Sequence, residues 1–105
     1  MQPKDGSRLL LELEKLRRDI NRETLNPPIP ELTIEDLRPI ITLAAQARLS
    51  YLEELFAIGS GAPDFPSPDR IASLAKRREA YEELRAAVNA LETAIDRGYL
   101  DVQEG

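Results

Sequence analysis

The chain has 105 residues, a length that suits one folded domain and is too short for two independent cores. It contains no cysteine and no histidine, which excludes disulfide bonds, thiolate nucleophiles, imidazole acid–base chemistry and zinc sites of the usual Cys and His kind. Its 14 basic and 19 acidic residues give a net charge of −5, which argues against a protein that binds nucleic acid through phosphate contacts.

The first predicted helix covers residues 7–24. Its large apolar residues fall on one stripe because they are separated by four, three and four positions. The stripe consists of Leu9, Leu13, Leu16 and Ile20. The other positions are mostly charged, and basic residues alternate with acidic ones, so an amphipathic helix is expected.

A proline-rich connection over residues 26–32 ends this helix, and we expect it to be extended and stiff. The second predicted helix covers residues 34–58, with Thr33 as its N-cap. Pro39 leaves two alternatives: either the helix kinks there, or residues 34–38 form a separate turn.

The second helix carries two adjacent apolar stripes, which predicts that it is the most buried of the three. One stripe contains Ile40, Ala44, Ala47, Tyr51, Leu55 and Ile58, and the other contains Ile41, Ala45, Leu52 and Phe56. Gly59 is the expected C-cap, and a second proline-rich connection follows over residues 59–67.

The third predicted helix covers residues 68–97, with Ser67 as N-cap, Pro68 at its first position and Gly98 after its end. Its apolar residues recur every seven positions, which is typical of a helix that packs along another helix. They are Leu74, Tyr81, Val88 and Ile95, with Leu84 and Leu91 between them.

These patterns predict an all-α fold with three helices in a single domain over residues 1–105. The second and third helices are expected to form a long antiparallel hairpin, with alanines around Ala44 opposite Tyr81. The first helix has two alternatives: it packs across its own hairpin, or it is exchanged with a second subunit in a homodimer.

Two residues outside the leucine stripe are further candidates for partner binding. Arg77 stands in the seven-residue repeat where an apolar residue is expected, and either pairs with Glu53 or Glu54 or marks a place where the seam opens to a partner. Phe65 stands between prolines, and either docks another protein or tucks against the helix start beside Ile71.

The sequence favours a small helical protein–protein interaction module, such as a scaffold, adaptor or regulatory subunit, rather than an enzyme. We expect no catalytic residues, no cofactor, no metal, no nucleic-acid or membrane partner, and a cytoplasmic location. The alternatives are a small helical enzyme that uses a carboxylate-bound divalent metal, and binding of nucleic acid or a membrane surface through the first helix. The carboxylates Glu79, Glu82 and Glu83 are expected on a solvated helix face.

Divalent metals should therefore leave the stability of the protein unchanged. A ligand that binds only the folded state raises the melting temperature, whereas solvated carboxylates hold no ion tightly. Thermal denaturation followed by circular dichroism, with and without millimolar Mg²⁺, Mn²⁺ or Zn²⁺, measures this. A rise of several degrees in the melting temperature with one of these ions would favour the alternative of a metal-dependent enzyme.

Overall fold

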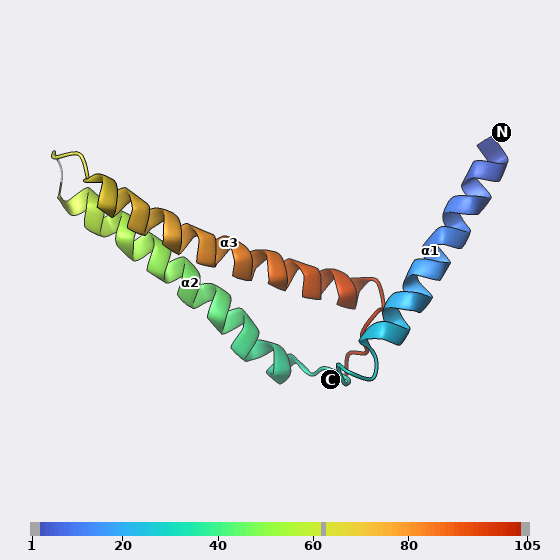
Figure 1. The fold of residues 1–105 in the computed structure, drawn as a ribbon. Helices are drawn as coiled ribbons and strands as arrows, with labels where there is room; N and C mark the ends of the chain where they lie inside the picture. Colours follow the sequence, from blue (N-terminus) through green and yellow to red (C-terminus); the bar gives the residue numbers. More distant parts are fainter. Residues whose placement is uncertain (1–2, 62, 104–105) are drawn as a thin grey trace. The chain divides into compact units, whose positions relative to one another are not determined.

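The computed structural model describes residues 3–61 and 63–103 of the chain. Three helices account for most of them: α1 (Pro3–Leu25), α2 (Ile34–Ser60) and α3 (Pro68–Asp96), shown in Figure 1. The predicted all-α, three-helix fold is confirmed. Helix α1 begins earlier than expected, at a proline, a residue that suits the first position of a helix because its missing N–H has no partner there.

The chain divides into two compact units, which we describe separately. One comprises Glu35–Ala90, the greater part of the α2–α3 hairpin, and the other comprises Met1–Ile34 with Leu91–Gly105. The single domain over residues 1–105 remains a prediction.

Helices α2 and α3 run side by side in opposite directions (Figure 1), as predicted. The members of the seven-residue repeat that belong to this unit, Leu74, Tyr81, Leu84 and Val88, are all half-buried. The matching seam of α2 has half-buried positions at Ala44, Ala47, Tyr51 and Ile58, and small alanines there let the two backbones approach closely.

The expectation that α2 is the most buried helix is wrong. Its second stripe is exposed, with Ile41 at 50% and Phe56 at 75% relative exposure. No residue of α2 is fully buried. The physical reason is that a pair of helices covers only the stripe that faces the partner.

Pro39 lies inside α2, which is helical from Ile34 onward, so residues 34–38 are not a separate turn. The proline is the sixth residue of the helix, where it removes one hydrogen bond to the carbonyl of Glu35. Its fixed φ is compatible with a helix, and a position so close to the N-terminus limits the loss to that bond.

The connection between α1 and α2 is not extended along its whole length, in contrast to the prediction. Residues 26–28 form a turn, because the backbone N–H of Asn26 donates to the carbonyl of Arg22 (2.9 Å) and that of Ile29 to the carbonyl of Leu25 (2.8 Å). Pro27 and Pro28 do not interrupt these bonds, because the donors are the N–H groups of Asn26 and Ile29.

The C-terminal segment closes the first unit by pairing with this connection. Leu32 and Val102 form an isolated parallel bridge, in which the N–H of Leu32 donates to the carbonyl of Asp101 (2.9 Å) and the N–H of Gln103 to that of Leu32 (2.8 Å). Leu100, directly before Asp101, is 4% exposed and is the one buried hydrophobic residue in the described part of the chain.

The end of α3 is a Schellman motif, as the sequence indicated at Gly98. The N–H of Tyr99 donates to the carbonyl of Ala94 (2.8 Å), and the N–H of Gly98 to that of Ile95 (3.1 Å). Gly98 has a φ of 76°, in the left-handed region. The prediction of Gly59 as C-cap is wrong, because α2 continues through it to Ser60.

Replacing these two glycines by alanine should have opposite effects. Gly98→Ala should destabilise the protein by about 1 kcal/mol, because a Cβ is disfavoured at positive φ although no atom lies near it. Gly59→Ala, also in open space but helical, should stabilise by up to about 1 kcal/mol. Urea unfolding curves measure both changes, and a Gly98→Ala variant as stable as the unmodified chain would contradict the role of the left-handed glycine.

Candidate functional site

The apolar stripe of α1 is exposed to solvent. Leu9 is 59% exposed, Leu13 44%, and Leu16 and Ile20 lie between these values. All four lie on one face of α1 because they are spaced by about one helical turn. Such a row of aliphatic side chains is a candidate surface for another protein.

Helix α1 is attached to the C-terminal segment through a different face. The guanidinium of Arg22 donates to the carbonyl of Gly98 (2.9 Å) and pairs with Asp101 (2.6 Å), and the side-chain amide of Asn26 donates to the carbonyl of Tyr99 (2.9 Å). All of these groups belong to one compact unit. The attachment of α1 is therefore polar and does not use the leucines.

A shallow pocket extends the same attachment along α1. Glu14, Arg17 and Arg18 line it from the helix, opposite Asp96, Arg97 and Tyr99. At 100° per residue, Glu14, Arg18 and Arg22 lie nearly half a turn around α1 from the leucine stripe. The stripe thus faces away from the segment that holds the helix.

One edge of the leucine stripe is acidic. Glu12, Asp19 and Glu23 lie beside Leu16 on the helical projection of α1. None of these three carboxylates has an ion-pair partner within the described residues. The exposed surface of α1 is therefore an apolar row bordered by unpaired negative charge.

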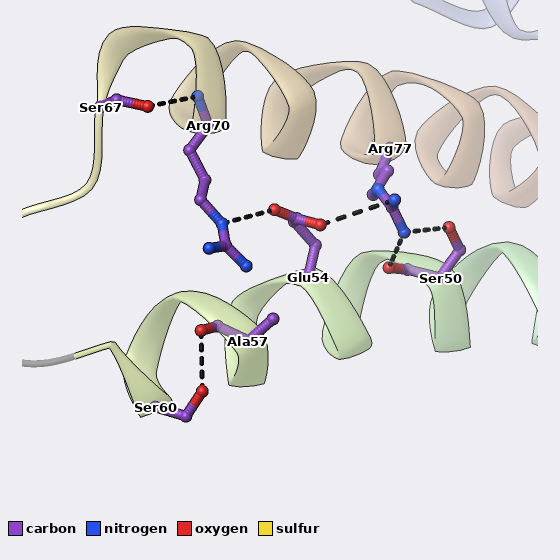
Figure 2. A network of polar contacts seen from close by, with 7 residues as sticks. All are labelled: Ser50, Glu54, Ala57, Ser60, Ser67, Arg70 and Arg77. Atoms are coloured by element: carbon purple, nitrogen blue, oxygen red, sulfur yellow. Dashed lines mark hydrogen bonds and ion pairs between the residues drawn. The ribbon is translucent and has the colours of Figure 1, made fainter.

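Arg77 lies between α2 and α3, where it forms the predicted ion pair with Glu54. Figure 2 shows Glu54 between Arg70 and Arg77, at 3.2 Å and 3.5 Å, and its side chain is only 12% exposed. Arg77 also donates to the backbone carbonyl and the hydroxyl of Ser50, both at 3.1 Å. The network connects the two helices, while a role of Arg77 in partner binding remains a prediction.

A second group of side chains joins the helices through Tyr81. The ring of Tyr81 stacks on that of Tyr51, with 6.1 Å between centroids. The guanidinium of Arg48 donates to the Tyr81 hydroxyl (2.9 Å) and lies 5.3 Å from the ring centroid. Arg48 thereby keeps a positive charge beside the seam without a carboxylate partner among the described residues.

Two shallow hollows lie along the hairpin, and each is lined by both apolar and arginine side chains. The first is lined by Ile41, Ala45, Arg48, Tyr81 and Arg85, among others. The second is lined by Tyr51, Ile71, Leu74, Ala75 and Arg78. On α3, Leu74 and Arg78 line one hollow, and Tyr81 and Arg85 line the other. The second pair follows the first by seven residues, so the two hollows lie on the same face of α3.

Phe65 does not tuck against the start of α3 beside Ile71. Its side chain is 88% exposed, and Ile71 is 40% exposed. The start of α3 is instead held by Ser67, whose hydroxyl accepts from the N–H of Arg70 (3.2 Å) as a predicted N-cap. Pro66 restricts the backbone of Phe65 to extended conformations, which do not continue into the helix.

The carboxylates of α3 are exposed, and Glu82 pairs with Arg85 at 2.8 Å. Hydrogen bonding to Glu82 raises the pKa of Arg85. On α2, the hydrogen bond from Arg38 lowers the pKa of Glu35, so that this pair is lost as the pH falls through the lowered value. The described residues contain no group of three or more acidic side chains placed to hold a metal ion.

Comparison with protein-family models, with curated proteins and with solved structures finds no match to this chain. Among the described residues, no helix combines the length and the apolar composition that a membrane span requires.

Sequence reasoning missed the arginines of the hairpin face, Arg48, Arg78 and Arg85. The signal that could have found them is their position: Arg78 and Arg85 each lie four residues after a member of the seven-residue repeat, which places them at its edge.

Neutralising Glu54 should weaken the hairpin. The Glu54→Gln variant keeps the shape of the side chain but leaves two arginines without their shared anion, and the expected loss is about 1 kcal/mol, since both arginines are partly solvated. Glu53→Gln is the control, because Glu53 is exposed and makes no ion pair in the described structure. Equal unfolding midpoints for the two variants would show that the network contributes nothing.

Proposed function

We propose that this protein is a small helical protein–protein interaction module that acts through its helix faces and self-associates as a homodimer. The surface that mediates self-association is the leucine stripe of α1. The proposal requires no cofactor and assigns no catalytic residue.

The observation that carries the proposal is the exposure of the leucine stripe on a helix held through its opposite face. Full burial of one leucine or isoleucine contributes about 1.5–3 kcal/mol, so covering the exposed half of four such side chains would contribute about 3–6 kcal/mol. Part of this gain offsets the entropy lost on association. A second subunit can cover the stripe while the contacts of Arg22 and Asn26 stay in place.

Phe65 offers an additional anchor for a partner of another kind. It is exposed in a connection that contains Pro63 and Pro66, and a stiff segment loses little conformational entropy when it is bound. An aromatic ring presented in this way resembles the anchors that dominate the energetics of interfaces.

Charged substitutions in the stripe should give a monomer. In the variant Leu13→Glu/Leu16→Glu, two carboxylates replace apolar side chains at the centre of the surface, so association should be lost at micromolar concentration. Size-exclusion chromatography with light scattering measures the mass, and circular dichroism should show that α2 and α3 remain helical. A monomeric mass for the unmodified protein at micromolar concentration would contradict the proposed homodimer.

Leu11→Glu is the matched control. Leu11 is 69% exposed on the same helix but lies off the stripe, so this substitution should leave the dimer intact. Dissociation by Leu11→Glu as well would show that the effect of the charges is not specific to the stripe.

A further inference from the structure

The face of the hairpin that contains the two hollows is a second apolar surface without a partner. Its exposed apolar side chains are Ile41 of α2, which is 50% exposed, and Ile71 of α3, which is 40% exposed. We name it the arginine-edged face and define it by its apolar and basic members. These are Ile41, Ala45, Ile71, Ala75, Arg78 and Arg85.

The charge of this face is positive. Arg78 and Arg48 make no ion pair within the described residues, and Arg48 donates to the hydroxyl of Tyr81. Glu82 neutralises only Arg85. The polar network around Glu54 in Figure 2 involves other positions of the seam, so its carboxylate is already occupied by Arg70 and Arg77.

Resting on the proposed function, we infer that the arginine-edged face receives α1 of a second copy of this chain, so that each subunit of the dimer inserts its leucine stripe into the other's hairpin. The result is two three-helix packings related by a twofold axis, a closed arrangement.

Charge complementarity supports this occupant. The acidic edge of the stripe, Glu12, Asp19 and Glu23, would be attracted by the positive charge of this face, where Arg78 forms no ion pair among the described residues and Arg85 is paired with Glu82. Opposite charges across an interface fix its orientation. An α1–α1 pairing would instead place two acidic edges close to each other. The hairpin face is thus the better complement.

The spacing of the two surfaces supports it as well. Arg78 and Arg85 are seven residues apart on α3, and Glu12 and Asp19 are seven residues apart on α1. Both separations correspond to about 10 Å along a helix. The leucine stripe has the same period, since Leu9 and Leu16 are also seven apart, so its side chains can enter both hollows at once.

Reciprocal charge reversal tests the inference. Arg78→Glu/Arg85→Glu and Glu12→Lys/Asp19→Lys should each raise the dimer Kd about tenfold, measured by sedimentation equilibrium, because each places like charges opposite one another. All four substitutions in one chain should restore the Kd to within about threefold. The control Lys76→Glu reverses one charge on α3 away from both surfaces, and should leave the Kd unchanged.

The outcomes separate this inference from the proposed function. In one outcome, Leu13→Glu/Leu16→Glu dissociates the dimer, but the arginine variant and the fourfold variant have the same Kd as the control. The leucine stripe then mediates association, but it binds a surface other than the arginine-edged face. A monomeric unmodified protein overturns both.

Cross-linking decides between a second copy and the chain's own hairpin. The chain has no cysteine, so introduced thiols are the only ones present. A Leu13→Cys chain mixed with an Ala75→Cys or an Ala45→Cys chain should form a covalent dimer with a short bismaleimide on a denaturing gel, whereas an outward-facing Glu79→Cys chain should not. A link formed only within a doubly substituted single chain at high dilution would place α1 on its own hairpin and overturn the inference.

Discussion

A pair of α-helices buries one stripe on each partner and leaves the remaining faces in water, and the other features of this structure depend on that limit. The seam between α2 and α3 is half-buried within the hairpin unit, and Leu100 is the single buried apolar residue in the described structure. Alanine at Ala44 and Ala47 brings the backbones close but contributes little apolar area. Hydrogen bonds from Arg77 to Ser50 and from Arg48 to Tyr81 add to the stabilisation that the small apolar seam provides.

The same limit explains why apolar side chains remain exposed on two separate faces. Burial of a helix on more than one side requires a third element, and within the first unit α1 is occupied with the C-terminal segment through Arg22 and Asn26. An interaction module needs this combination of a stable scaffold and an apolar surface that its own contacts do not use. The proposed dimer gives both faces a partner of matching charge and period.

The helices and the hairpin could be predicted from the sequence, because period and capping are local signals. The seven-residue repeat of α3, the Ser67 cap and the Gly98 end all depend on residues within a few positions of one another. The burial of α2 could not be predicted, since two stripes on one helix do not reveal how many partners cover them. For the candidate site, the stripe on α1 was evident, but its attachment depends on Asp101 and Tyr99, far away in the chain.

The separation in sequence of the contacts also bears on the order of folding. Contacts within the hairpin join residues 16 to 33 positions apart, as in the pairs Arg70–Glu54 and Arg48–Tyr81. Contacts that attach α1 to the C-terminal segment join residues 73 to 79 positions apart. Closing the longer loop costs more chain entropy, so we expect the hairpin to form first and the attachment of α1 to residues 98–101 to form later. During synthesis the bridge from Leu32 to Val102 cannot form until residues 101–103 have been made, and until then α1 lacks the contacts that attach it to this segment.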